Sequence, residues 1–175
     1  MSPRPAPDVL AVELRVWEAL AAVHDPEIPP LAITDLGIVE AVRVTPERVQ
    51  VDLLPTFAGC PALDVIREDV TAAVRSAAEG REAAVRFIYA PAWTSDRITP
   101  EGRRKLRESG FSPPAPVGEE PLLLTITSRT SRIPPTCPYC ESTDTAMENR
   151  FGPTPCRSIF YCNGCMQPFE QFKSV

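Results

Sequence analysis

Two Cys-x-x-Cys pairs near the end of the chain constrain its fold more than any other feature. The pairs are Cys137/Cys140 and Cys162/Cys165, and 21 residues separate one pair from the other. Two residues between cysteines let the backbone turn around one ion with both thiolates bound, and two facing turns give a tetrahedral tetrathiolate. The spacing is slightly longer than the range that is usual for paired zinc knuckles. The pattern therefore predicts a closed metal site, and zinc is the metal that we expect there.

Other metals suit the same four ligands. A rubredoxin-like iron centre is one alternative to zinc, and an iron–sulfur cluster is another. Short strands expected at residues 145–149 and 157–161, between the two pairs, indicate a zinc ribbon. A block of about 40 residues is too small for a self-sufficient core, so we expect the metal to supply much of its folding free energy.

The sequence contains one histidine, His24, and this narrows the possible chemistry. One copy of the chain cannot build a catalytic zinc site with two or three histidines, nor a diiron bundle with two Glu-x-x-His pairs. His24 lies at the end of a helical pattern, where ending or capping the helix is its simplest role. Ionisation near neutral pH gives it an alternative, functional role.

Charge and hydropathy exclude further classes. The net charge is −5, so the basic surplus of a sequence-independent nucleic-acid binder is missing and no nucleic-acid partner is expected. A local basic cluster at residues 103–107 is interpreted as the solvated face of a helix. There is no run of about 18 apolar residues, so no membrane partner is expected. We expect a cytoplasmic protein, whose reducing surroundings favour metal-bound or working thiols over disulfides.

Apolar periodicity predicts an α+β fold for the first half of the chain. Steps of three and four residues indicate a helix from Asp8 to His24, ended by Asp25-Pro26, and a second helix from Pro61 to just before Gly80. A loop is expected at residues 27–30. Strands are expected at residues 37–44, 49–53 and 84–89. The order helix, strand, strand, helix, strand closes a small layer near residue 90.

We divide the chain into four parts. We expect a disordered leader at residues 1–7, the α+β domain at 8–90, a helix and proline-rich linker at 91–120, and the zinc ribbon domain at 121–175. In the linker, Thr99-Pro100 marks the start of a short basic helix and Gly110 its end. A further strand is expected at residues 122–127.

Cys60 is the candidate working thiol. It precedes Pro61 at the start of the second helix, where free N–H groups and the helix dipole lower the pKa of a thiol. A buried cysteine that acts as a small apolar filler is the alternative. The acidic loop residues Asp25, Glu27 and Asp35 belong to the same layer. Beside a thiolate they would form an open metal site for brief iron binding, whereas Asp25 and Asp35 would otherwise cap turns.

Cys156 is the sixth cysteine and lies in the turn between the two ribbon strands. We hypothesise that it approaches Cys60 across the interface between the two domains. The alternatives are a spare thiol and a substitute zinc ligand.

Several catalytic motifs are absent from the sequence. It contains no glycine-rich phosphate loop, no dinucleotide fingerprint and no Gly-x-Ser-x-Gly elbow, and one histidine gives no convincing serine triad. A thioredoxin-like redox role for Cys137 and Cys140 is disfavoured by the second matching pair and by the lack of an expected βαβ unit.

Three motifs of the first domain are similar to a known signature. They are Asp-Pro-Glu-Ile-Pro at residues 25–29, Asp-Leu-Gly at 35–37, and Thr56-x-x-x-Cys60-Pro61. This signature resembles that of the small metal–sulfur cluster biosynthesis domain, which SufT and eukaryotic cytosolic iron–sulfur targeting proteins share. Three further segments, at residues 92–96, 110–114 and 168–173, resemble the PaaD family, which belongs to the phenylacetyl-CoA epoxidase system. With them the resemblance covers the chain from about residue 10 to 173.

The resemblance implies an accessory protein, not an enzyme, of aerobic phenylacetate catabolism. Its implied partners are the diiron oxygenase subunits of the epoxidase, their iron–sulfur flavin reductase and the iron–sulfur assembly machinery. The α+β domain would handle iron or an iron–sulfur cluster through Cys60, and the ribbon would dock on the client. One alternative is a non-catalytic zinc-ribbon module that organises the complex, and another is a thiol oxidoreductase. Glu141 stands where the family leads us to expect glycine, so we expect the turn of the first knuckle to differ.

Overall fold

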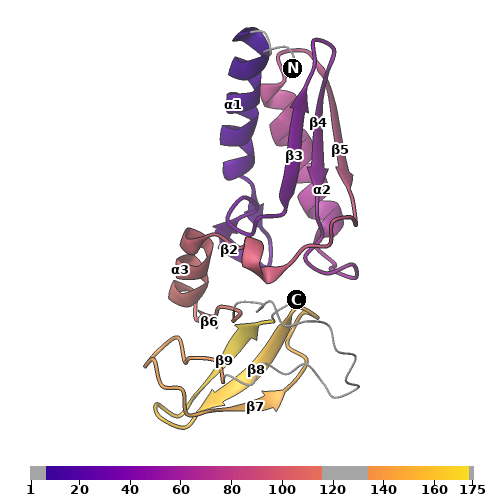
Figure 1. Cartoon of the computed structure of the whole chain (residues 1–175). Coiled ribbons are helices and arrows are strands. Elements are labelled where there is room, and N and C mark those ends of the chain that lie inside the picture. The colour runs from indigo at the N-terminus through magenta and orange to yellow at the C-terminus, as the bar shows by residue number, and fades with distance from the viewer. Residues whose placement is uncertain (1–6, 116–133, 174–175) are drawn as a thin grey trace. The chain divides into compact units, whose positions relative to one another are not determined.

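The structure, a computed structural model, describes residues 7–115 and 134–173, which form two compact units (Figure 1). The first unit contains the described residues up to Trp93 together with Arg97–Gly102. The second contains Thr94–Asp96 and the described residues from Arg103 onward. Residues 1–6 of the expected leader and the strand expected at 122–127 lie outside the described residues, and Pro7 already belongs to the first helix.

The first unit confirms the expected α+β order. Its main elements are α1 (Pro7–Ala21), β3 (Val39–Val44), β4 (Arg48–Leu53), α2 (Leu63–Ala77) and β5 (Glu82–Phe87). The strands form one sheet in the order β3-β4-β5, in which β3 is antiparallel and β5 parallel to β4. The helices contact each other, and α1 also packs on β3 and α2 on β5. Both helices therefore cover the same face of the sheet.

The core of this unit follows from two residue periodicities. Alternate residues of β4, from Val49 to Leu53, are fully buried and point to the helix-covered face. Steps of four residues place the buried side chains of each helix on one stripe. These side chains are Val12, Val16 and Leu20 of α1, and Ile66, Val70 and Val74 of α2.

The segment β4–α2–β5 is a βαβ unit, which the sequence analysis did not expect. Parallel pairing runs from Arg48↔Glu82 to Leu53↔Phe87, so both strands end at the same edge of the sheet. Because a parallel pair needs a long crossover, the chain passes from β4 through a loop containing Cys60 into α2. The lack of a βαβ unit was used above against a thioredoxin-like role for Cys137 and Cys140, and that argument was wrong. The βαβ unit that is present contains neither cysteine.

Two expectations between residues 22 and 32 are wrong. Helix α1 ends at Ala21 and not at His24, because the next two N–H groups bond to carbonyls three residues back and the helix tightens into a turn. The expected loop at 27–30 instead contributes to β2 (Ile28–Ala32), which pairs with β1 (His24–Asp25). His24 thus lies in a strand, with its Nδ1 2.5 Å from the carbonyl oxygen of Pro29.

The sheet face away from the helices is polar and centred on Asp52. Asp52 is 1 % exposed, and its carboxylate accepts hydrogen bonds from Arg86 Nε at 2.7 Å, from Gln50 Nε2 at 3.0 Å and from Arg43. The hydrogen bond from Arg86, reinforced by Arg43, outweighs burial and holds the pKa of Asp52 well below its usual range. A buried carboxylate is thus kept ionised by cations from both neighbouring strands.

Replacing Asp52 with asparagine is expected to lower the free energy of unfolding by about 2–3 kcal/mol near pH 7, because two guanidinium groups lose their anion. A pKa lowered by folding contributes stability that is present above the unfolded value of about 3.9 and is lost as pH falls toward the folded value. Urea unfolding at pH 7 and pH 3 should therefore show a smaller difference between wild type and variant at pH 3. The exposed pair Arg48–Glu82 supplies the control, and Glu82→Gln is expected to change stability by less than about 1 kcal/mol. A pH-independent difference would contradict this account.

The second unit contains the ribbon. Within the described residues its sheet has the order β6-β9-β8-β7. The strands are β6 (Phe111–Ser112), β7 (Thr145–Asn149), β8 (Arg157–Cys162) and β9 (Gln167–Phe172). The two strands expected between the cysteine pairs, β7 and β8, are confirmed as an antiparallel pair. Strand β9, which pairs with β8 along its whole length, was not expected.

The short basic helix is confirmed as α3 (Pro100–Glu108), which the two units share. Thr99 caps it by accepting a hydrogen bond from the N–H of Gly102 at 2.9 Å. The basic cluster is not uniformly solvated. Arg104 and Arg107 are exposed, but the half-buried Arg103 donates to the carbonyls of Ser95 at 2.8 Å and Pro114 at 2.6 Å. None of the described helices combines the length and apolar character needed to cross a membrane.

Candidate functional site

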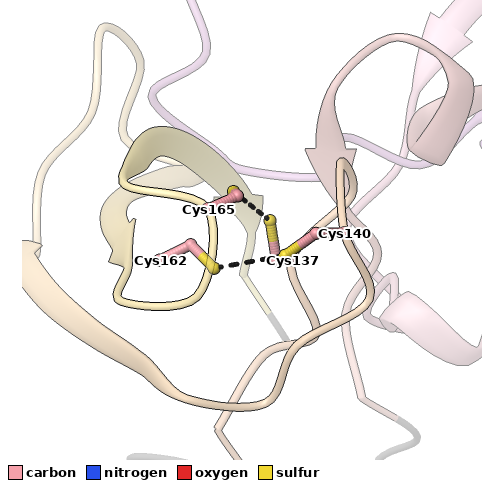
Figure 2. Close-up of side chains that lie close together, drawn as sticks. All are labelled: Cys137, Cys140, Cys162 and Cys165. Carbon is pink, nitrogen blue, oxygen red and sulfur yellow. Dashed lines mark hydrogen bonds between the residues drawn. The ribbon is translucent and has the colours of Figure 1, made fainter.

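The cysteine cluster of the second unit is the first candidate site (Figure 2). All four Sγ atoms of Cys137, Cys140, Cys162 and Cys165 lie within 4.8 Å of one another. Sγ of Cys137 is 3.7 Å from that of Cys165, and Sγ of Cys140 is 3.5 Å from that of Cys162. In residues 7–115 and 134–173, no other group of three or more His, Cys, Asp or Glu side chains brings its ligand atoms together in this way.

The cluster has the dimensions of a zinc tetrathiolate. With Zn–S bonds of about 2.3 Å, a tetrahedral site has sulfur–sulfur edges of about 3.8 Å. The distances of 3.5 and 3.7 Å agree with this value and are far longer than a disulfide bond of about 2 Å. The donor set and its geometry therefore fit one zinc ion, which would be held in a closed site with no position left open for substrate.

Two matching turns position the sulfur atoms. The N–H of Glu141 donates to the carbonyl of Cys137 at 3.0 Å, and the N–H of Met166 donates to that of Cys162 at 2.9 Å. Both residues are left-handed, with φ of 61° and 59°. The expectation that Glu141 changes the first turn is wrong, because glutamate adopts the left-handed backbone at a strain of about 1–2 kcal/mol. Closure of the four-sulfur site explains why that strain is tolerated.

The surroundings of two thiols in the cluster shift their pKa values in opposite directions. The backbone N–H of Cys165 hydrogen-bonds the Cys162 sulfur and lowers the pKa of that thiol to about 7. Burial, reinforced by the neighbouring sulfurs, raises the pKa of Cys165 to about 12. Because only the thiolate binds a metal, occupation of the site by a divalent cation would release the protons of the four thiols.

Among the residues that the structure describes, a small apolar group surrounds the cysteine cluster. Phe160 and Phe169 stack with ring centroids 5.8 Å apart, and they form one buried group with Cys137 and Cys162. Within the described residues this is a small apolar group, so we expect metal binding to contribute to the folding of the ribbon.

Cys60 is the second candidate site. It is half-buried in the loop between β4 and α2, where its N–H donates to the Phe57 carbonyl at 3.0 Å and its carbonyl accepts from the Leu63 N–H at 3.4 Å. Cys60 therefore lies in the turn that leads directly into α2. This loop is at the carboxyl edge of the parallel pair β4–β5, the edge at which α/β sheets place their binding sites.

Two of the three acidic residues expected to act with Cys60, Asp25 and Asp35, cap turns. Oδ1 of Asp25 accepts hydrogen bonds from the N–H groups of Glu27 at 2.7 Å and Ile28 at 3.1 Å. Oδ2 of Asp35 accepts from the N–H of Ala32 at 3.1 Å. The described residues do not bring Asp25, Glu27, Asp35 and Cys60 into one metal-holding group. Turn capping is thus observed, and iron handling by these residues stays a prediction.

A set of hydrogen bonds that holds the turn at residues 35–37, which we call the clasp, was not predicted from the sequence. Three donors hold three consecutive carbonyls at 2.9 Å each: Trp93 Nε1 on Leu36, Arg97 Nε on Gly37 and the Thr99 N–H on Asp35. Gly37 has φ of +63°, and a Cβ there would lie 2.3 Å from the carbonyl oxygen of Arg97. The clasp lies within the first unit and fixes one of the three signature motifs. Trp93, which follows β5 by a few residues, was the available signal in the sequence, because tryptophan is highly buried on average.

Cys156 belongs to the second unit and stands outside the metal cluster. It is half-buried, its Sγ lies 3.1 Å from Oγ1 of Thr154, and its carbonyl accepts from the Lys173 N–H at 2.9 Å. The four clustered sulfurs form a complete ligand set without it. Its approach to Cys60 stays a prediction.

Comparisons with known proteins agree with this division into units. Residues 125–173 match the family described as PaaD zinc beta ribbon domain, and residues 13–87 match the family described as iron–sulfur cluster assembly protein. The crystal structure of a domain of unknown function, DUF59, from Bacillus anthracis matches with a TM-score of 0.52 and 26 % identity, over 57 % of this chain and 94 % of that one.

Two curated relatives extend the comparison. A protein of Porphyromonas gingivalis named Fe–S protein maturation auxiliary factor is 32 % identical over 57 % of this chain and 94 % of its own length. A protein of Escherichia coli, provisionally named as the D component of 1,2-phenylacetyl-CoA epoxidase, is 37 % identical over 91 % of this chain and 92 % of its own length. Because this second relative aligns along nearly the whole of both chains, and the ribbon matches the PaaD description, the chain belongs to the PaaD family of phenylacetyl-CoA epoxidase components.

Proposed function

We propose that this chain is a non-catalytic accessory protein that assists the assembly or insertion of iron or iron–sulfur centres in a phenylacetyl-CoA epoxidase system. The observation that carries the proposal is the union of two parts in one chain. The first unit is similar to proteins named Fe–S protein maturation auxiliary factors, and the ribbon is similar to that of PaaD. A maturation unit joined to an epoxidase-specific unit suits a factor dedicated to one client.

In this proposal the thiols have separate tasks. The four ribbon cysteines hold one zinc ion permanently, since a closed tetrathiolate has no free position for exchange. Cys60 handles iron or a cluster transiently, with Cys156 as a second thiol and with Asp25, Glu27 and Asp35 as further candidate ligands. The half-buried position of Cys60 supports this task, because a thiol that exchanges metal has to be reachable from solvent.

Exposed apolar side chains near the Cys60 loop also support a handover between proteins. Phe57, in the same loop, is 42 % exposed, and Tyr89, just after β5, is 65 % exposed. Strands β4 and β5 end together, so both side chains follow the same edge of the sheet as Cys60. Apolar side chains exposed at such an edge suit contact with another protein. The proposed clients are the diiron oxygenase subunits and the iron–sulfur flavin reductase, with the iron–sulfur assembly machinery as supplier and the ribbon docking on the client.

Iron content of the clients tests the proposal. The oxygenase and reductase are produced without this chain, with the wild-type chain, and with the Cys60→Ala or Cys156→Ala variant. Iron per client protein is then measured by inductively coupled plasma mass spectrometry. We expect either variant to lower client iron toward the level found without the chain. Ser76→Ala, an exposed change on α2, is the matched control and should behave as wild type.

Each outcome separates the candidate functions. Full metallation of the clients with Cys60→Ala would contradict the iron-handling role and favour a zinc-ribbon module that only organises the complex. Turnover of a thiol–disulfide substrate by the purified chain, abolished by Cys60→Ala, would instead establish a thiol oxidoreductase.

A further inference from the structure

Helix α1 carries an apolar stripe on its solvent side in addition to its buried one. Leu10 is 43 %, Leu14 66 % and Trp17 37 % exposed, and Ala21 is also exposed. Their spacing of four, three and four residues places them on a single face of the helix. The buried stripe of Val12, Val16 and Leu20 occupies the opposite face. The helix is therefore apolar on two sides.

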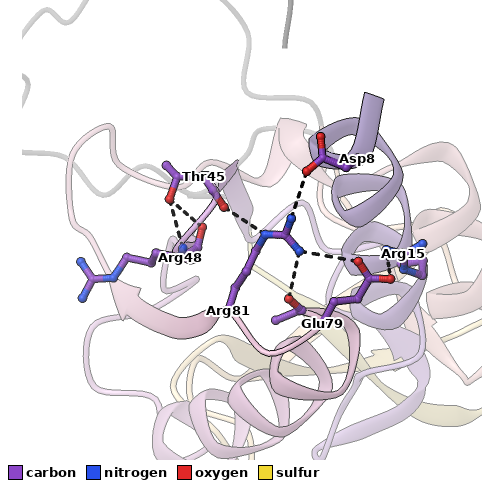
Figure 3. A network of polar contacts seen from close by, with 7 residues as sticks. Asp8, Arg15, Thr45, Arg48, Glu79 and Arg81 are labelled. Atoms are coloured by element: carbon purple, nitrogen blue, oxygen red, sulfur yellow. Dashed lines mark hydrogen bonds and ion pairs between the residues drawn. The ribbon is translucent and has the colours of Figure 1, made fainter. Parts of the chain in front are cut away.

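Polar contacts fix the rotation of α1 in this position (Figure 3). Arg15 pairs with Glu79 at 2.6 Å, and Asp8 accepts from Arg81 at 3.4 Å. Arg81 also donates to the carbonyl of Thr45 at 3.1 Å, so the network joins α1 to the end of α2 and to the β3–β4 turn. The buried stripe of α1 is packed against the core, and the network holds Asp8 and Arg15 in place. The exposed stripe therefore cannot turn toward the core.

The neighbouring helix shows what a solvated face normally contains. The exposed positions of α2 are mostly charged or small, as at Arg67, Glu68, Asp69 and Arg75, with Val65 as a single large apolar exception. A single exposed apolar side chain needs no explanation, whereas a continuous stripe marks an interaction surface. The stripe of α1 is continuous over three helical turns.

Charge identifies the kind of partner that fits. At 100° per residue, Glu13 and Glu18 lie about 70° to either side of the centre of the stripe. A second copy of α1 would place glutamates against glutamates in either orientation, and an anionic membrane surface would be repelled. A partner helix whose apolar face is flanked by Lys or Arg would be attracted on both sides.

We propose that the outer stripe of α1, Leu10, Leu14, Trp17 and Ala21, docks an amphipathic helix with basic flanks on a client protein. The inference rests on the proposed function for the identity of the client, the oxygenase or the reductase. Trp17 is the largest side chain of the stripe, and buried tryptophans are the commonest energetic anchors of protein interfaces. The stripe contains none of the cysteines, so it would position the client without taking part in metal binding.

Calorimetric titration of the purified oxygenase and reductase with the full chain tests the proposal. Leu14→Glu, at the most exposed position, is expected to weaken binding at least about tenfold, as for loss of an interface anchor. Glu13→Lys with Glu18→Lys is expected to weaken it about tenfold at low salt and to reverse its salt dependence. Ala72→Glu introduces the same charge at an exposed position of α2 and should bind within about twofold of wild type.

A spectroscopic measurement reports burial of the stripe directly. The sequence contains two tryptophans, of which Trp17 is 37 % and Trp93 4 % exposed. With 5-fluorotryptophan in the chain, the fluorine resonance of Trp17 should shift when unlabelled client is added, and that of Trp93 should stay in place.

Normal binding by Leu14→Glu and by the double variant, or no complex of the wild-type chain with either client, would overturn the inference. A wild-type dimer in sedimentation velocity that Leu14→Glu dissociates would also overturn it, because the stripe would then belong to a second copy. The proposed function is judged separately by client iron. If client iron depends on the chain but the α1 variants bind the client normally, the proposed function is supported and the docking surface is not. If client binding depends on α1 but client iron is the same with and without the chain, the docking surface is supported and the proposed function is not.

Discussion

Replacing Cys162 with serine is expected to unfold the ribbon and leave the first unit folded. Loss of one of four thiolates removes the closed site, and structural zinc contributes on the order of 10 kcal/mol to the folding of small zinc domains. Among the described residues, the buried group around Cys162 holds two aromatic rings besides the cysteines, and these cannot replace that contribution. Two-dimensional amide NMR of the full chain should show collapse of the ribbon resonances, while those of α1 and α2 keep their dispersion. Zinc per chain should fall from one to near zero.

Cys156→Ser is the matched control for this experiment. It changes the same atom in the same unit but lies outside the four-sulfur cluster. Zinc content and the ribbon spectrum are expected to stay as in wild type. A Cys162→Ser variant that keeps its zinc and its ribbon resonances would show that the metal is dispensable for the fold.

Replacing Gly37 with alanine is expected to destabilise the first unit by about 3–5 kcal/mol. The added Cβ would lie 2.3 Å from the backbone oxygen of Arg97, and backbone atoms cannot move aside as a flexible side chain can. Relief of the clash would have to open the clasp, including the bonds from Trp93, Arg97 and Thr99. Urea unfolding monitored by tryptophan emission measures the effect, since Trp17 and Trp93 both belong to the first unit.

Gly80 separates backbone strain from the clash. Its φ is +81°, yet a Cβ there would meet no atom within 4 Å. Gly80→Ala therefore carries only the penalty of a left-handed alanine, about 1 kcal/mol. Equal destabilisation by the two substitutions would mean that the clasp makes no energetic contribution.

Local periodicity explains most of what could be predicted of the fold. Both main helices, the strands β3 to β5 and the ribbon strands β7 and β8 follow from spacing of apolar residues and from turn residues. The parallel pairing of β4 with β5 was missed because the two strands are distant in sequence, whereas the β1–β2 hairpin and β9 were missed although their pairing partners are close in sequence. In β2 the two prolines at 29 and 30 suggested a loop, although a two-stranded sheet has room for residues without an N–H.

The candidate site also has a part that local sequence predicts and a part that it does not. The spacing of Cys137, Cys140, Cys162 and Cys165 was enough to predict the cluster, because a Cys-x-x-Cys turn is a local geometry. The clasp on residues 35–37 could not be found in this manner, since its acceptors are backbone carbonyls that every residue carries. The effect of Glu141 was misjudged because local propensity favours glycine, whereas closure of the metal site dictates the backbone.

Metal analysis of the chain purified without oxygen tests the separation of the two thiol sites most directly. The account predicts one zinc per chain in wild type and in Cys60→Ala, and loss of that zinc in Cys162→Ser. It also predicts iron in addition to zinc in the wild-type chain, and loss of that iron in Cys60→Ala. Iron that disappears with Cys162 but persists without Cys60, or a chain that never carries iron under these conditions, would contradict it.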